Sequence, residues 1–225
     1  MAGPRPVFEA KRFTIGDRMR IFLGVTGASG AAYGGHALRA LTRAGCHVGL
    51  CVSGAGCQVI SHEVLGEGAR PVVPRDVVVG RFVERFADGA GTVEVLDPRD
   101  IAASFASGSS LTPAALVAPC STSTLAKIAH GTGENLIHRA AEVMLKERRR
   151  LVIVPRETPL SAIHLRNMLA LTEAGAVVLP AMPGLYTLPR TVDDMVDFVV
   201  GKALDQLGVP HDLLARWGER ERVGP

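Results

Sequence analysis

The chain alternates short apolar runs with amphipathic segments, and this alternation predicts parallel strands joined by helices. Strands are predicted over residues 20–25, 47–52, 92–96, 114–118, 151–154 and 176–179. Helices are predicted over residues 31–44, 55–65, 122–129, 136–147, 161–174 and 191–207. The stretch 66–100 is the least regular, because three prolines interrupt it. The pattern favours an α/β fold, a doubly wound parallel sheet with helices on both faces.

The length of 225 residues is enough for one sizeable core. We therefore predict a single α/β domain over residues 20–219. Residues 1–19 mix prolines with charged side chains and are expected to form a polar N-terminal extension, and residues 220–225 a C-terminal tail.

Composition and charge argue against several kinds of partner. The net charge of +3 comes from interspersed signs, and aromatic residues make up only 4% of the chain. Neither nucleic acid nor a membrane surface is therefore indicated. There is no run of about 18 apolar residues and no hydrophobic signal segment at the start, so a cytoplasmic protein is expected. The four cysteines form no C-x-x-C pair and show no zinc-ligand spacing, so no metal is expected.

The most informative motif is the glycine turn Val25-Thr26-Gly27-Ala28-Ser29-Gly30, between the first predicted strand and the first predicted helix. Gly27 and Gly30 are expected to allow a positive φ and a close approach of a ligand to the backbone. The unpaired amides of the next helix would attract an anion, and phosphate is the natural ligand. The motif is not a full dinucleotide fingerprint, and tight turns also use Gly and Ser for structural reasons alone.

Further polar loops adjoin the predicted strands. They are Ser53-Gly54, residues 106–110, residues 119–124, residues 155–159 and residues 180–186. Because ligands bind beyond the carboxyl ends of parallel strands, we expect these loops to gather at one edge of the sheet.

Three of these groups have a structural and a functional interpretation. The hydroxyls of Ser121 to Thr124 could cap a helix, or they could contact a second anion or a flavin. Arg156 and Glu157 could form an ion pair that fixes a loop, or they could bind a phosphate and move protons. Arg139 and Lys146 lie seven residues apart on one predicted helix and could share a dianion, but spacing alone favours a solvated face on which Lys146 pairs with Glu142.

Six motifs in order resemble the flavin prenyltransferase (UbiX) family, from about residue 20 to residue 219. They are G-V-T-G-A-S-G, A-S-G-S, P-C-S-T-S-T-L, N-L-I-H-R-A-A-E-V-M-L-K-E-R-R, V-P-R-E-T-P-L-S-x-I-H-L-x-N-M and P-A-M-P-G-L-Y. The resemblance implies a flavodoxin-like or Rossmann-like fold and a metal-independent transferase. The implied reaction joins a dimethylallyl group from dimethylallyl phosphate to N5 and C6 of reduced FMN. The prenylated FMN would then serve a partner decarboxylase. The family also implies a homo-oligomer of trimers, expected to be a dodecamer.

The resemblance also implies roles for individual residues. The FMN contacts are expected to be Gly27, Ala28, Ser29, Ser53, Ser121, Thr122, Ser123, Thr124 and Arg156. The expected catalytic residues are Ser29, Glu63 and Glu157. The prenyl phosphate site is expected to comprise Arg139, Lys146, Tyr186 and Lys202, the first two contributed across a subunit interface.

Two positions depart from the family pattern, and two other functions stay open. Lys202 replaces a usual arginine, and Ile101 stands where a tryptophan is usual. One alternative is a flavin-dependent decarboxylase of the cysteine type, although the asparagines of its P-A-S-A-N-T and P-x-M-N motifs are absent. The other is a flavin carrier without catalysis.

Overall fold

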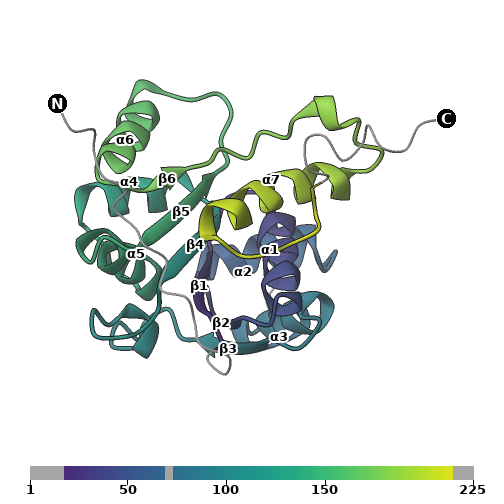
Figure 1. Cartoon of the computed structure of the whole chain (residues 1–225), viewed down its shortest axis with the longest axis horizontal. Coiled ribbons are helices and arrows are strands. Elements are labelled where there is room, and N and C mark those ends of the chain that lie inside the picture. The colour runs from purple at the N-terminus through teal and green to yellow at the C-terminus, as the bar shows by residue number, and fades with distance from the viewer. Residues whose placement is uncertain (1–17, 69–72, 215–225) are drawn as a thin grey trace.

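The computed structural model describes residues 18–68 and 73–214. Six parallel strands form one sheet in the order β3-β2-β1-β4-β5-β6 (Figure 1). The strands are β1 Arg20–Val25, β2 His47–Val52, β3 Thr92–Leu96, β4 Ala114–Cys120, β5 Arg150–Pro155 and β6 Val177–Val178. The predicted doubly wound sheet is thus confirmed. Residues 1–17 of the expected extension and the expected C-terminal tail lie outside the described residues.

Helices cover both faces of the sheet (Figure 1). Helices α1 Ala31–Arg43, α2 Gly54–Glu63, α3 Arg75–Phe86 and α7 Val192–Leu207 form one layer, and α4 Thr122–His130, α5 Leu136–Lys146 and α6 Ala162–Glu173 form the other. Two short 3₁₀ turns lie at Ser104–Ala106 (η1) and Leu185–Thr187 (η2). No helix in the described ranges is long and apolar enough to cross a membrane.

The hydrophobic core forms two clusters, one on each face of the sheet, because side chains alternate between the faces along each strand. On β1, Ile21, Leu23 and Val25 face the α1 layer, and Phe22 faces the α5 layer. All four side chains are fully buried. This period of two is what a strand covered on both faces requires, and it explains the continuous apolar runs in the sequence.

Helix α3 was not predicted, because prolines and glycines around it obscured its apolar pattern. Pro74 stands at the N-cap, where a missing N–H costs little, and Val78, Val79, Phe82 and Phe86 form its buried face. Tertiary packing against α1 and α2 therefore defines this helix more than its local sequence does.

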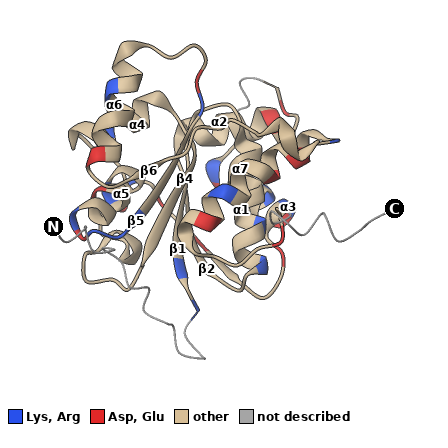
Figure 2. Ribbon diagram, turned by 45° about the horizontal axis from the view of Figure 1, so that its top comes forward, with Lys and Arg blue, Asp and Glu red and all other residues tan. Residues whose placement is uncertain are grey.

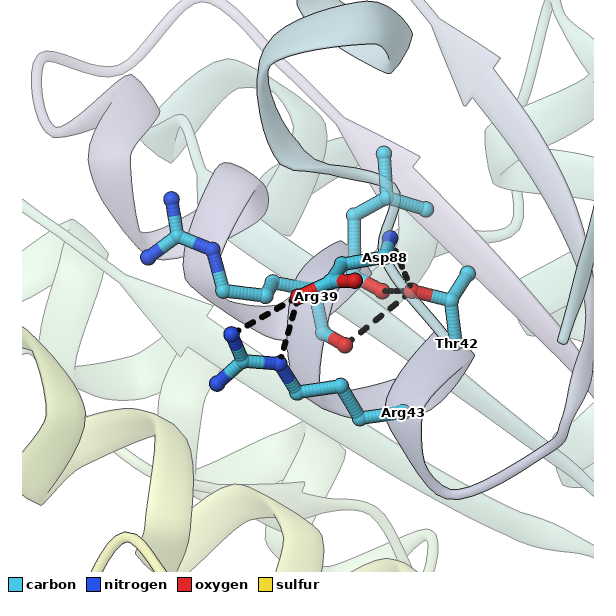
Figure 3. A network of polar contacts seen from close by, with 5 residues as sticks. Arg39, Thr42, Arg43 and Asp88 are labelled. Carbon is cyan, nitrogen blue, oxygen red and sulfur yellow. Dashed lines mark hydrogen bonds and ion pairs between the residues drawn. The ribbon is translucent and has the colours of Figure 1, made fainter. Parts of the chain in front are cut away.

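The C-terminal turn of α1 is tied to the loop that follows α3 (Figure 3). The guanidinium of Arg43 donates to Asp88 at 2.7 and 2.9 Å, and the Asp88 amide donates to Thr42 Oγ1 at 3.0 Å. Thr42 in turn donates to backbone carbonyls of the preceding helical turn. These bonds anchor the end of α1 that lies away from the glycine turn.

Candidate functional site

The glycine turn and the segment after β4 lie next to each other, where the strand order reverses. Thr26 Oγ1 donates to the Pro119 carbonyl at 2.9 Å and accepts from the Ser121 amide at 2.8 Å. Thr26 is 1% exposed, so this bridge is shielded from water. The crevice between β1 and β4 is the usual ligand position in a doubly wound sheet.

The two glycines of the turn serve different purposes. Gly30 has φ +109°, which L side chains rarely adopt, as predicted. The expectation of a positive φ at Gly27 was wrong. A Cβ at Gly27 would lie 2.5 Å from the Cβ of Ala55, so this glycine allows the turn to pass close to the start of α2.

The amides at the start of α1 already hold an anion, the carboxylate of Glu63. Glu63 Oε2 accepts from the Gly30 amide at 2.8 Å and from the Ala31 amide at 2.9 Å. Two of the amides expected to attract phosphate are therefore bonded to a carboxylate of the same chain, and phosphate binding at this turn stays a prediction. The helix N-terminus attracts a negative charge as expected, but that charge comes from the last residue of α2.

Charge and hydrogen bonds outweigh burial in setting the ionisation of Glu63. Partial burial alone would raise its pKa. The Ser29 hydroxyl, the two amides and the Arg156 guanidinium together lower the pKa below its ordinary value. Arg156 Nε also donates to the Ser29 carbonyl at 3.0 Å. The structure thus brings Ser29, Glu63 and Arg156 together, although they lie on three separate segments.

Tyr33 belongs to the same cluster and was missed by the sequence analysis. Its ring packs over Gly30, where an added Cβ would meet Cδ2 at 2.9 Å. Burial raises the pKa of Tyr33, and the nearby Arg156 partly opposes that rise. Its position in the first turn of α1, directly after the glycine turn, is the signal that could have identified it.

The serines after β2 and β4 both cap helices, which was one of the two interpretations of Ser121 and was not predicted for Ser53. Ser121 Oγ accepts from the Thr124 amide at 3.2 Å, and Ser53 Oγ accepts from the Gly56 amide at 3.0 Å. Among the described residues, the hydroxyls of Thr122 and Ser123 have no hydrogen-bond partner. They are therefore available to a ligand at the first turn of α4.

Arg156 and Glu157 do not pair, so the structural interpretation of this segment was wrong. Glu157 Oε1 accepts from the Thr158 amide at 3.0 Å, whereas Arg156 turns toward the glycine turn. Both side chains are half-buried and border a cavity of about 50 Å³. Its apolar lining comes from Leu160, Met168, Pro180, Ala181 and Met182.

Tyr186 and Lys202 share one aromatic neighbour, Phe198. The rings of Tyr186 and Phe198 meet edge to face with centroids 5.7 Å apart, and Lys202 Nζ lies 5.9 Å from the Phe198 centroid. Tyr186 and Lys202 are exposed, so both polar ends can reach a ligand. Phe198 was not predicted as part of the site. Its signal is its position one turn before Lys202 on the last helix.

Arg139 and Lys146 lie on α5, in the layer opposite α7, so one chain does not bring them to Lys202. Both are exposed, and Figure 2 shows that cations occur on both helix layers. Lys146 pairs with the adjacent Glu147, not with Glu142 as the spacing suggested.

The loop 106–110 lies at the other edge of the sheet, so its predicted position was wrong. The loop precedes β4, and the Gly108 carbonyl accepts from Arg149, which lies just before β5. A segment that enters a strand lies at the amino end of that strand. The side chain of Lys146 is near this loop, since an added Cβ at Gly108 would lie 3.0 Å from Nζ.

The comparisons with known proteins agree on the kind of protein that this chain resembles. The Flavoprotein family model matches residues 14–204. A flavin prenyltransferase UbiX of Halalkalibacterium halodurans is 50% identical over 197 residues, covering 88% of this chain and 92% of the relative.

Two solved structures have the same fold. AnUbiX (PadA1), in complex with FMN and dimethylallyl pyrophosphate, is 40% identical, with a TM-score of 0.77 over 90% of this chain and 98% of that one. A dodecameric FMN-dependent UbiX-like decarboxylase from Escherichia coli O157:H7 is 41% identical, with a TM-score of 0.73 over 86% of this chain and 97% of that one. In the described part of this chain, no group of three His, Cys, Asp or Glu side chains could hold a metal ion.

Proposed function

This chain belongs to the Flavoprotein family and, within it, to the UbiX flavin prenyltransferases, and we propose that it prenylates reduced FMN. The dimethylallyl group would come from dimethylallyl phosphate and would be joined to N5 and C6 of the flavin. The observation that carries this proposal is the set of polar side chains gathered at the carboxyl edge of the sheet. There the unpaired hydroxyls of Thr122 and Ser123 adjoin the cluster of Ser29, Glu63 and Arg156.

The residues at this edge suit a flavin mononucleotide. Polar contacts are available from the glycine turn, from the first turn of α4 and from Arg156. The residues that would hold FMN are Gly27, Ala28, Ser29, Ser53, Ser121, Thr122, Ser123, Thr124 and Arg156. Reduced FMN supplies the nucleophilic atoms N5 and C6 when it is bound. The chain must supply orientation, exclusion of water and a site for the leaving phosphate.

Cations would stabilise the leaving phosphate. When the C–O bond of the prenyl phosphate breaks, its electron pair leaves on the phosphate, and fixed positive charges stabilise the developing anion. Tyr186 and Lys202 provide one half of such a site. We propose that Arg139 and Lys146 of a second copy provide the other half. Their exposure on the opposite layer supports this, as does the dodecameric assembly of the relative from Escherichia coli.

Two acids can move protons. Glu157 lies beside the apolar cavity and would accept, on a carboxylate oxygen, the proton released from C6 when the new ring closes. Glu63 and Ser29 are hydrogen-bonded to each other and would relay protons near the glycine turn. The aliphatic and methionine side chains of the cavity would keep water from the allylic cation.

We further propose that the prenylated FMN is passed to a decarboxylase that uses it as a cofactor. The recipient would take a flavin with an added ring, so it is identified by its cofactor and not by a surface on this chain.

Anaerobic incubation with reduced FMN tests the proposed reaction. Mixed with dimethylallyl phosphate, the protein should yield a flavin heavier by one C5H8 unit, detected by mass spectrometry. Dimethylallyl pyrophosphate, the molecule bound to AnUbiX, should be tested in parallel. Oxidised FMN is the matched control and should give no adduct. A protein that binds FMN and gives no adduct with either donor would support the carrier alternative, and decarboxylation of a peptidyl cysteine would support the cysteine-type alternative.

A further inference from the structure

Helices α1 and α7 are joined by a buried histidine that has no role in the proposed chemistry. His36 lies in the second turn of α1 and is 6% exposed. Its Nδ1 is 2.7 Å from Asp197 Oδ1, and its Nε2 is 3.6 Å from Asp193 Oδ1. Both aspartates lie on α7, which packs across α1 (Figure 1).

The hydrogen bond to Asp197 has a defined direction. An ionised carboxylate can only accept, so Nδ1 carries the hydrogen and donates it. On its other side, the imidazole meets the ring of Phe86 from α3, with centroids 5.9 Å apart. Gly35 allows this contact, because a Cβ there would lie 2.5 Å from the Phe86 ring. His36 is therefore held between α3 and α7 and has little freedom to adjust.

The residue after Asp197 is Phe198, which Tyr186 and Lys202 both contact. Gly184 lets the Tyr186 segment lie against α7, since an added Cβ would be 2.7 Å from Tyr186 and 2.8 Å from Phe198. The bond at Asp197 therefore fixes α7 beside Phe198, one turn before Lys202 and against the ring of Tyr186.

The other end of this connection is the glycine turn. Helix α1 begins at Ala31, whose amide is bound by Glu63, and His36 follows about 8 Å along the helix axis. One buried side chain thus connects the helix that starts at the flavin edge to the helix that presents Phe198. We infer that His36 is a positioning residue for prenyl transfer, because it sets the distance between the flavin edge and the prenyl phosphate half-site. This inference rests on the proposed function.

Two substitutions separate positioning from packing. His36→Leu keeps most of the side-chain volume and removes both nitrogen contacts, whereas His36→Asn retains an N–H donor near the position of Nδ1. Arg43→Gln is the matched control, because it breaks the α1 ion pair with Asp88 at the end of α1 that lies away from the glycine turn.

The measurements are the KM and kcat for dimethylallyl phosphate, and the Kd values of FMN and of dimethylallyl phosphate, the latter by calorimetry on the oxidised FMN complex. We expect His36→Leu to raise the KM and the Kd of the prenyl phosphate about tenfold, with the Kd of FMN changed less than about twofold. His36→Asn should recover most of the loss, and Arg43→Gln should match the wild type. In a double-mutant cycle, Asp197→Ala should add little to His36→Leu.

Two outcomes overturn the inference while the proposed function stands. In one, the wild type turns over and His36→Leu matches it in KM. In the other, His36→Leu weakens FMN and prenyl phosphate binding by the same factor, which indicates only a general packing role. A wild type that neither binds nor converts the prenyl phosphate overturns the proposed function, and the inference with it.

Discussion

The carboxyl edge of the sheet carries the proposed flavin site, and the exposed face of α5 carries two of the proposed phosphate-binding cations; the two regions differ in how many of their contacts one chain provides. At the edge, Ser29, Glu63 and Arg156 bind one another within one chain. On α5, Arg139 and Lys146 face solvent in the opposite helix layer. The comparison teaches that one chain can preorganise the proposed flavin site, whereas the phosphate site proposed above draws on a second copy.

Removal of a cation from α5 should have the largest effect. Lys146→Ala should lower kcat/KM for dimethylallyl phosphate by about 10² to 10³, because it removes a preorganised charge beside the leaving phosphate. The affinity for FMN and the thermal stability should barely change, since within residues 18–68 and 73–214 the polar partner of Lys146 is the exposed side chain of Glu147. Steady-state kinetics, flavin titration and thermal unfolding check these three quantities, with Arg43→Ala as the exposed-cation control.

Mixed assemblies sharpen this test. Lys146→Ala and Lys202→Ala chains should each be nearly inactive alone. Unfolded together and refolded as a mixture, they should regain about a quarter of wild-type activity, because one site in four would combine the intact half of each chain. Recovery in the mixture would contradict a phosphate site built within one chain, and no recovery would contradict the site shared between copies.

Loss of Arg156 should weaken flavin binding at the carboxyl edge of the sheet. Arg156→Ala removes the hydrogen bond to the Ser29 carbonyl and a positive charge near Glu63 and Tyr33. We expect FMN to bind about 10- to 100-fold more weakly, as is typical for the loss of a charged hydrogen bond. Fluorescence titration measures the Kd of FMN, and monomers separated from the assembly should show the same loss of affinity. An unchanged Kd would place Arg156 outside the flavin site.

The sequence was sufficient for local patterns and insufficient for contacts between distant segments. The helix cap at Ser121 and the positive φ at Gly30 depend on neighbouring residues, and both were predicted. Glu63 reaches the α1 amides from another helix, 33 residues along the chain, and no periodicity indicates that. A loop that leads into a strand lies at its amino end, so the position of residues 106–110 could have been predicted from chain direction alone.

The separation of the cations depends on topology. Right-handed crossovers place the β4-to-β5 helices on one face, and this much follows from the strand order. Helix α7 follows the last strand and returns across the sheet to pack on α1, which no crossover rule requires. The family resemblance therefore selected Arg139, Lys146 and Lys202 as candidates, but their distribution over two layers needed the structure.

A smaller effect should follow when the carboxylate of Glu63 is neutralised. The pKa of Glu63 is lowered in the folded chain, so its contribution to stability is full above the ordinary value of 4.5 and is lost as the pH falls through the lowered pKa. Glu63→Gln should therefore cost about 0.5 to 1 kcal/mol at pH 7 and almost nothing in strong acid. Urea unfolding at several pH values measures the difference in the free energy of unfolding between the variant and the wild type. The control Glu84→Gln, at an exposed position on α3, should show no pH dependence of this difference.

Replacement of Lys202 by arginine should give the smallest change, and it should be a gain. A lysine ammonium contacts phosphate as a point charge, whereas a guanidinium donates two parallel hydrogen bonds and can stack on the ring of Phe198, 5.9 Å from Nζ. Lys202→Arg should lower the KM for dimethylallyl phosphate about threefold, with little change in the Kd of FMN. Lys202→Gln, as the uncharged control, should raise the KM. If both variants raised the KM equally, prenyl phosphate binding at residue 202 would depend on the shape of lysine and not on its charge. The α7 half of the phosphate site would then need a different cation.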